Sequence, residues 1–143
     1  MKLDWAILAN AAEVQNNLIY VLGGGWDTGS RPQYPAPFQG ALAMRLLLHP
    51  TEMSKPHKVE IQLNDEDGHS IAPTIGLNTN PSPPPPNHPT GWDVAALVVV
   101  GMQSLMIPKA GGYSLEILLD DQHFRTIPFR FVQVTAPATP QIQ

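Results

Sequence analysis

Residues 58–63 alternate strictly between polar and apolar side chains, reading Lys-Val-Glu-Ile-Gln-Leu, and no other feature constrains the fold as strongly. Successive side chains of a β-strand point to opposite faces of the sheet, so this pattern predicts a strand with one buried and one solvated face. The same period of two recurs in residues 42–48 and 113–120. A chain built from such short alternating segments is expected to be all-β.

Tight turns are predicted where residues that tolerate a left-handed backbone separate two apolar segments. Asn16-Asn17 stands between residues 3–14 and 18–22, residues 64–68 end in a glycine, and Asp120-Asp121 precedes the last segment. Asn, Asp and Gly adopt the positive φ angles of short hairpin turns more readily than other residues. Helix is the alternative for residues 5–14, because Ala, Leu and Glu favour it. The β-branched and aromatic return segment favours a hairpin.

Three segments are expected to depart from a simple half-buried strand. Residues 70–77 contain Pro73, which lacks the N–H that a central strand needs, so an edge position is predicted. Residues 94–102 are almost entirely apolar, which predicts burial on both faces or a cover over the second face. Pro128 interrupts the final strand, where we expect an edge bulge.

About nine extended segments with regular turn signals predict a two-sheet antiparallel β-sandwich. The motif Pro-x-x-Gly-Gly-Tyr, which ends at Tyr113, is typical of a corner in immunoglobulin-like sandwiches, where the tyrosine hydroxyl bonds back to the preceding loop. A jelly roll is the alternative topology. We expect a single domain over residues 1–134, with residues 78–90 as a proline-rich loop insertion and 135–143 as a flexible C-terminal tail.

Composition narrows the classes of function. The chain has no cysteine, which excludes a disulfide scaffold and a thiolate metal site and agrees with a reducing, cytoplasmic compartment. The net charge is −4 and the eight basic residues are scattered, so no nucleic-acid partner is expected. The first residues do not read as a signal peptide and no apolar run is long enough to span a bilayer, so no membrane partner is expected either.

The tripeptide Gly-Trp-Asp occurs twice and supplies the candidate ligand site. Trp26 and Asp27 follow the first hairpin, and Trp92 and Asp93 precede the apolar segment 94–102. Two indoles could form platforms for a carbohydrate or a peptide proline. The alternative is that each tryptophan anchors a loop and each aspartate bonds the amides of its turn, and this alternative is favoured.

Other polar clusters fit ordinary structural roles better than chemistry. Gly23-Gly24-Gly25 is followed by a proline-rich stretch and not by the helix that a phosphate loop requires. Residues 65–67 are acidic but lack the calcium-loop spacing, which favours a solvated hairpin tip. The five histidines are dispersed, His49 and His57 being the pair most able to meet, and no nucleophile elbow occurs. No catalytic residue, metal or cofactor is therefore expected.

Two motifs also carry a resemblance to known proteins. The opening hairpin that ends in Gly-Gly-Gly-Trp-Asp-Thr and the late segment Gly-Gly-Tyr-Ser-Leu-Glu-Ile resemble a family of small bacterial proteins of unknown function. The resemblance covers most of the chain outside the proline-rich loop and the tail. It implies a bacterial, cytoplasmic β-sandwich and carries over no catalytic residue.

A non-enzymatic protein-interaction or assembly module is the leading expectation for function. It rests on the apolar segment 94–102, whose second face a neighbouring subunit could cover, and on the absence of a reactive set of side chains. The chain is therefore expected to bind a protein partner or to form a homo-oligomer. The alternatives are a small-ligand binding domain that uses the two tryptophans and, more remotely, a metal-dependent hydrolase.

Overall fold

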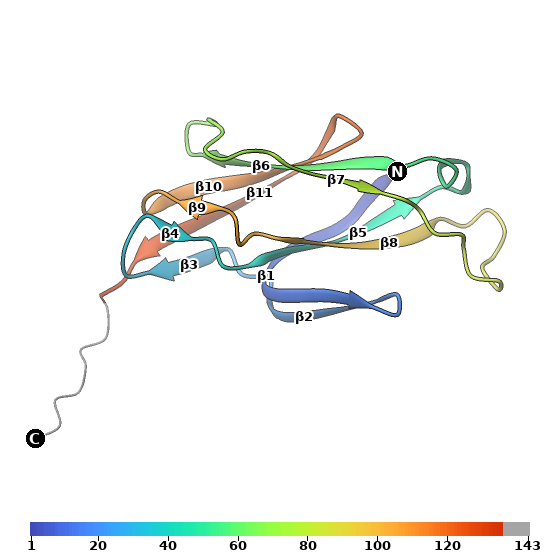
Figure 1. The fold of residues 1–143 in the computed structure, drawn as a ribbon, viewed down its shortest axis with the longest axis horizontal. Helices are drawn as coiled ribbons and strands as arrows, with labels where there is room; N and C mark the ends of the chain where they lie inside the picture. Colours follow the sequence, from blue (N-terminus) through green and yellow to red (C-terminus); the bar gives the residue numbers. More distant parts are fainter. Residues whose placement is uncertain (136–143) are drawn as a thin grey trace, which may run out of the picture.

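The computed structural model describes residues 1–135, which form strands and one short 3-10 helix (Figure 1). The elements are β1 (Lys2–Gln15), β2 (Leu18–Gly24), β3 (Thr28–Arg31), β4 (Ala36–Pro37), β5 (Ala41–Leu48), η1 (Pro50–Glu52), β6 (His57–Asp65), β7 (Ile75–Thr79), β8 (Val94–Gly101), β9 (Met106–Ile107), β10 (Gly111–Leu119) and β11 (Gln122–Gln133). The predicted all-β class is confirmed. The tail predicted for residues 135–143 lies, apart from its first residue, outside the described residues.

The strands form two larger sheets and one small one. The order is β2-β1-β5-β8 in the four-stranded sheet, β3-β11-β10-β6-β7 in the five-stranded sheet and β4-β9 in the smallest. The expectation of purely antiparallel sheets is wrong at one edge, because β3 runs parallel to β11 and pairs Thr28 with Arg130. A parallel pair cannot be joined by a hairpin. Here about a hundred residues separate the two strands, so no local turn signal announces the pairing.

Apolar side chains from both larger sheets meet in one buried cluster. Leu42, Met44, Leu46 and Leu48 of β5 belong to it, as do Val59, Ile61 and Leu63 of β6 and Leu115, Ile117 and Leu119 of β10. In β6 and β10 these residues lie on the apolar face that the period of two predicts. In β5 the opposite face is also buried at Ala41 and Ala43. Phe38, Phe129 and Phe131 fill one end of the cluster with mutual edge-to-face contacts at centroid distances of 5.3–5.9 Å.

Two of the predicted turns have the backbone that the sequence requires. Asn16 and Asn17 have φ angles of 51° and 61°, and Asp120 and Asp121 have φ angles of 49° and 67°. Gln15 faces Leu18 across the first turn, and Leu119 faces Gln122 across the other. Both turns therefore have two residues with positive φ, the geometry that matches the twist of the flanking strands.

Prolines mark edges, as predicted, although one bulge is displaced. Pro73 lies before β7, which begins at Ile75 and occupies an edge of the five-stranded sheet. Pro128 pairs with Ser114 in regular register, and the bulge lies nearer the turn, where the register shifts between Ile117 and Leu118. The register tolerates Pro128 because β3 pairs with β11 only from Arg130 onward, which leaves the other side of this position without a strand.

Within one chain, residues 94–102 are not buried on both faces, and a cover supplied by a second subunit stays a prediction. β8 is an edge strand, and only Val98 and Val100 are buried within it. Its remaining side chains are partly or fully exposed, Ala95 most clearly. Within residues 1–135, no helix reaches the length and apolar content that crossing a bilayer requires.

Candidate functional site

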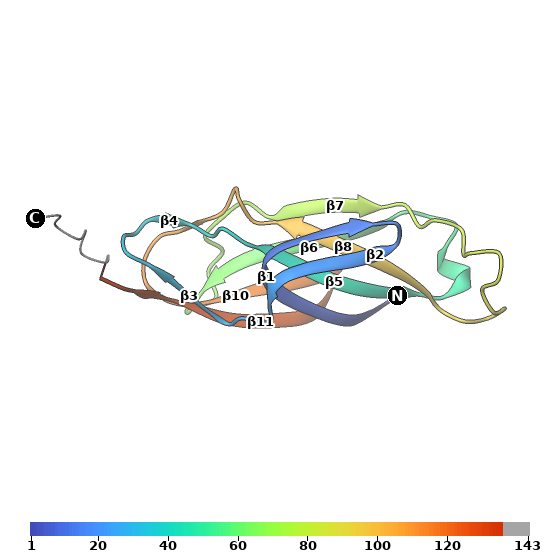
Figure 2. The same ribbon diagram turned by 90° about the horizontal axis from the view of Figure 1, so that it is seen from below.

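The first hairpin extends beyond the sheet to which it belongs. β1 pairs with β5 through residues 2–9 and with β2 through residues 9–15, so its second half has a neighbour on one side only. In Figure 1 this part of the hairpin lies below the other strands, and Figure 2 shows it from beneath. We call residues 10–24 the arm. An isolated two-stranded ribbon of this kind gains little stability from its own contacts in water.

The arm exposes large apolar side chains. Leu22, Leu18 and Tyr20 are 72%, 58% and 52% exposed, and Val14 and Val21 are also exposed. The register places Leu18, Tyr20 and Leu22 on one face of the ribbon and Val14 and Val21 on the other. Both faces therefore expose apolar side chains to water, and Glu13 and Gln15 lie on the same face as Tyr20 and Leu18. Soluble proteins rarely leave contiguous apolar surface exposed unless a partner covers it.

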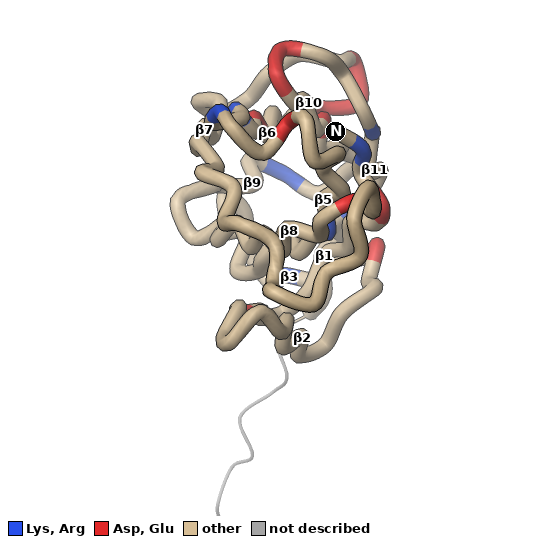
Figure 3. The backbone as a smooth tube through the Cα atoms, turned by 90° about the vertical axis from the view of Figure 1, so that its right-hand side faces the viewer, with Lys and Arg blue, Asp and Glu red and all other residues tan. Residues whose placement is uncertain are grey.

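The outer edge of the arm carries no feature that blocks pairing. β2 reads Leu-Ile-Tyr-Val-Leu-Gly-Gly and contains neither a charged residue nor a proline. Figure 3 accordingly draws β2 in tan, the colour of uncharged residues. β2 is also an edge of its sheet. Edge strands that must stay single are commonly protected by lysine, proline or a bulge. The arm thus offers free backbone groups together with apolar side chains.

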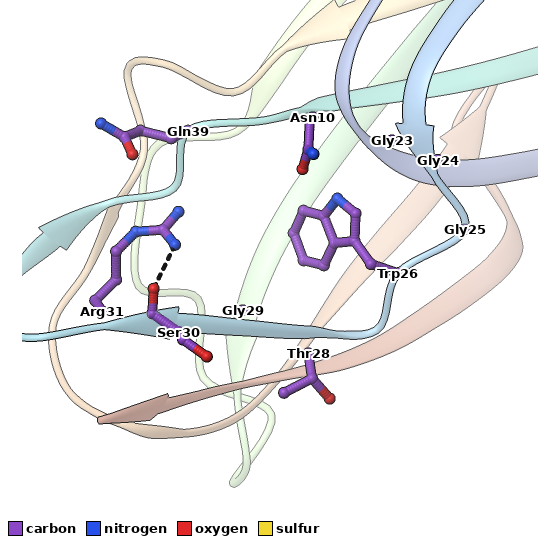
Figure 4. A pocket seen from close by; sticks show the side chains of 10 residues that line it. All are labelled: Asn10, Gly23, Gly24, Gly25, Trp26, Thr28, Gly29, Ser30, Arg31 and Gln39. Carbon is purple, nitrogen blue, oxygen red and sulfur yellow. Dashed lines mark hydrogen bonds between the residues drawn. The ribbon is translucent and has the colours of Figure 1, made fainter. Parts of the chain in front are cut away.

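A pocket of about 530 Å³ lies at the base of the arm. We call it the basal pocket; its lining comprises Asn10, Gly23, Gly24, Gly25, Trp26, Thr28, Gly29, Ser30, Arg31 and Gln39 (Figure 4). The three consecutive glycines present bare backbone on one wall. Gly23 and Gly25 have φ angles of 62° and 90°, which explains the glycine run as a sharp exit from β2.

Trp26 borders the basal pocket and also packs against the core. Its ring lies 5.8 Å from Phe38 and 6.2 Å from Phe131, centroid to centroid. Its Nε1 atom is buried and has no hydrogen-bond partner among the described residues. Asp27 is exposed, and its carboxylate accepts a hydrogen bond from the Thr28 hydroxyl at 3.1 Å. Trp26 therefore combines a structural contact with an unused donor.

Trp92 lies far from Trp26. Gly40, next to the first residue of β5, approaches the Trp26 ring, whereas Val94 pairs with the last residue of that strand, Leu48. β5 has eight residues, so the two ends are about 23 Å apart at the usual rise per residue. Trp92 is 65% exposed and Asp93 is partly buried. The structure does not bring the two Gly-Trp-Asp tripeptides into one site.

Tyr113 joins the start of β10 to the turn before it. Its hydroxyl donates a hydrogen bond to the backbone carbonyl of Lys109, and its ring stacks on Phe129 at 5.8 Å. Burial raises the pKa of Tyr113, although the bond to Lys109 acts in the opposite direction. The hydroxyl is thus held as a neutral donor.

The acidic hairpin tip has an internal hydrogen-bond pattern. Asp65, Asp67 and His69 bring potential ligand atoms within 4.8 Å of one another. One oxygen of the Asp65 carboxylate accepts bonds from the backbone N–H groups of Asp67 and His69, at 3.0 and 2.9 Å. These hydrogen bonds belong to a local turn, which explains why the three side chains lie close together.

His49 and His57, the two histidines most able to meet, have separate hydrogen-bond partners. His49 caps η1 and interacts with Thr51, whereas His57 is buried between Asp120 and the carbonyl of Glu52. Each imidazole therefore has a local structural partner of its own.

Neither the arm nor Arg31 is predicted from the sequence as part of a functional site. A usable signal was present for the arm, because residues 18–22 are apolar at every position and thus place apolar groups on both faces of a ribbon. The role of Arg31 had no such signal, since its neighbours in the pocket come from β1, the glycine run and the segment before β5.

Comparison with known proteins assigns the chain to a family. Residues 4–132 match the model of a family of unknown function, DUF6941. Comparisons with curated proteins and with solved structures found no match. The matched range includes the arm, the basal pocket and the Tyr113 strand, and it confirms the resemblance to an uncharacterised family. The chain therefore belongs to the DUF6941 family of unknown function.

Proposed function

We propose that this chain is a non-enzymatic protein-interaction module that self-associates through the arm. The observation that carries the proposal is the exposure of Leu18, Tyr20 and Leu22 on one face of a ribbon that has apolar residues on its other face as well. The surface expected from the sequence was the 94–102 strand. The structure favours the arm instead, because β8 contributes no large side chain to the exposed apolar set of residues 1–135.

A second copy of the chain is the occupant that the chemistry of β2 favours. An uncharged strand can pair with itself in antiparallel orientation without placing like charges opposite each other. Such pairing uses the same surface on both copies, which closes the assembly as a two-fold dimer. It would also join the two four-stranded sheets through their β2 edges.

The free energy gained by burying the exposed apolar side chains of the arm is of the same order as the cost of association. Completing the burial of a half-exposed Leu or Tyr contributes on the order of 1 kcal/mol. Leu18, Tyr20 and Leu22 on each of two arms therefore contribute on the order of 5 kcal/mol. This gain lies within the range of about 4–15 kcal/mol estimated as the cost of association. New backbone hydrogen bonds between the β2 edges add to this contribution.

Light scattering during size-exclusion chromatography tests the proposal. The unmodified chain is expected to elute as a dimer at concentrations on the order of 100 μM. The double variant Tyr20→Lys, Leu22→Lys is expected to be monomeric, because it places like charges at the centre of the interface. Phe124→Lys is the matched control, since Phe124 is also exposed but lies outside the arm, and it should remain dimeric.

Two outcomes would contradict the proposal. One is an unmodified chain that stays monomeric at that concentration. The other is a dimer that persists in the double variant while Phe124→Lys disrupts it. The circular dichroism spectrum of each variant establishes that a change of mass reflects association and not unfolding.

We further propose that the fold is an immunoglobulin-like sandwich and that the protein is cytoplasmic. A shared core between the two larger sheets and the bond from Tyr113 to Lys109 support an immunoglobulin-like sandwich. The lack of cysteine supports a cytoplasmic location, since a chain without disulfides is compatible with a reducing environment.

A further inference from the structure

Arg31 is a positively charged side chain in the basal pocket that has no acidic partner. The salt bridges of the described residues involve other basic groups. Its guanidinium donates instead to three backbone carbonyls: Pro37 at 3.3 Å, Ser30 at 2.8 Å and Phe38 at 2.6 Å. These bonds fix the position of the group without neutralising its charge. A guanidinium has five N–H donors, so two stay available.

The surroundings stabilise the charge of Arg31 but supply no counter-ion. The guanidinium carbon lies 5.0 Å from the centre of the buried Phe131 ring, and the side chain is only partly exposed. None of the residues that line the pocket is acidic, although the whole chain has a net charge of −4. A half-buried cation that lacks a counter-ion in an acidic protein indicates a place for an external anion.

Other groups in the pocket can complete the binding of a small molecule. Figure 4 shows the Arg31 guanidinium and the Trp26 indole extending into the pocket from opposite sides, with the Asn10 amide above the indole. The amide offers both a donor and an acceptor. Gly25 has open space where a side chain would lie, so one wall stays accessible. The pocket therefore pairs one fixed cation with an aromatic surface.

We propose that the basal pocket binds a small organic carboxylate. Arg31 would hold the carboxylate with its two remaining N–H groups, and the body of the ligand would lie beside Trp26. A single guanidinium matches the charge and planar geometry of one carboxylate. A phosphate dianion would be less well matched, because no second basic residue lines the pocket. The site is distinct from the paired-tryptophan platform expected from the sequence and does not depend on self-association.

Nuclear magnetic resonance of the indole N–H groups provides a direct readout. The three tryptophans give three indole signals, and a Trp26→Phe variant assigns the one of interest. Sodium acetate and sodium benzoate are titrated to concentrations on the order of 10 mM, with sodium chloride of matched ionic strength as the reference. We expect a saturable shift of the Trp26 signal with the carboxylates, larger for benzoate because its ring reaches the indole.

Two variants and a control locate the site. Arg31→Gln removes the cation and should weaken binding about tenfold or more. Asn10→Asp is isosteric, leaves all three backbone contacts of Arg31 in place and introduces a repelling charge, so it should abolish the shift even if Arg31→Gln perturbs the loop. Arg125→Gln makes the same change of charge outside the pocket and should bind as the unmodified chain does.

Three results would overturn the inference. The first is a Trp26 signal that does not shift saturably with either carboxylate. The second is equal affinity in Asn10→Asp and the unmodified chain. The third is tighter binding of inorganic phosphate than of both carboxylates, which would reject the assigned ligand class. These results are separate from the test of self-association, because Tyr20 and Leu22 do not line the pocket.

Discussion

His57, the first residue of β6, is a buried polar residue stabilised by two polar contacts of its ring. It is 3% exposed, and its two ring nitrogens lie 2.7 Å from a carboxylate oxygen of Asp120 and 2.7 Å from the carbonyl oxygen of Glu52. Both partners are acceptors, so the ring satisfies them together only when it is protonated. The hydrogen bond to Asp120 and the bond to Glu52 accordingly raise the pKa of His57, while burial opposes them.

The raised pKa predicts a loss of stability in alkaline solution. A group that binds its proton more tightly in the folded state stabilises that state below its ordinary pKa of about 6.5 and ceases to do so as the pH rises through the folded value. The melting temperature should therefore fall as the pH rises above about 6.5. Asp120→Asn should lower the free energy of unfolding near pH 6 by about 1–2 kcal/mol and flatten this dependence. Circular dichroism melts of the unmodified chain and of Asp120→Asn measure the pH dependence of the melting temperature. Identical pH profiles would contradict the stabilisation of protonated His57 by Asp120.

Gly29 provides a second prediction for a single residue. A Cβ atom at this position would lie 2.5 Å from the Phe131 ring, which is buried and cannot move aside. Gly29→Ala should therefore reduce the free energy of unfolding by about 1–3 kcal/mol. Gly76→Ala is the control, because a Cβ there has no neighbour within 4 Å, and its effect should stay within about 0.5 kcal/mol. Urea unfolding compares the two, and equal effects would contradict the close packing of Gly29.

Among the elements, the β1–β2 hairpin has the clearest division between a structural and an exposed part. Residues 2–9 of β1 pair with β5 and contribute Leu8 and Ala9 to the core, whereas the arm contributes no side chain to the buried set. Local stability should follow this division, because the arm has one strand partner and many exposed backbone groups. The arm can therefore be shortened without loss of the fold.

Shortening the arm separates folding from association. Replacing residues 12–21 by Asn-Gly keeps Ala11 opposite Leu22 and supplies a two-residue turn of the same type. The shortened chain should be monomeric in light scattering, and its free energy of unfolding in dilute solution should change by no more than about 1 kcal/mol. Asn17→Gly keeps the full arm and serves as the control, which should remain dimeric. A shortened chain that fails to fold would show that the arm is part of the core.

At the scale of the whole molecule, self-association links stability to concentration. A dimer that forms only from folded chains shifts the folding equilibrium by mass action, so its melting temperature rises with protein concentration. We expect such a rise over roughly a hundredfold range for the unmodified chain. Neither the shortened chain nor the double variant Tyr20→Lys, Leu22→Lys should show it. Scanning calorimetry at several concentrations provides the measurement, and a constant melting temperature in all three would argue against the dimer.

Sequence periodicity was sufficient for the longer strands, the turns between them and most of the core, but not for the short strands β3, β4 and β9. The alternation in residues 58–63 identified an inner face correctly, and Asn16-Asn17 and Asp120-Asp121 identified turns, because both signals depend on the local backbone alone. Pro73 also marked an edge correctly, since a missing N–H restricts any sheet position.

Three features depended on contacts between distant parts of the chain. β3 pairs in parallel with β11, β8 lies at an edge where apolar composition suggested a covered strand, and the arm extends beyond its sheet. The basal pocket likewise assembles Asn10, Arg31 and Gln39 from separate segments. Local periodicity specifies which way a side chain points, but the neighbour that covers it is set by how the strands assemble. Exposure of the arm and isolation of the Arg31 charge are for that reason properties of the tertiary structure.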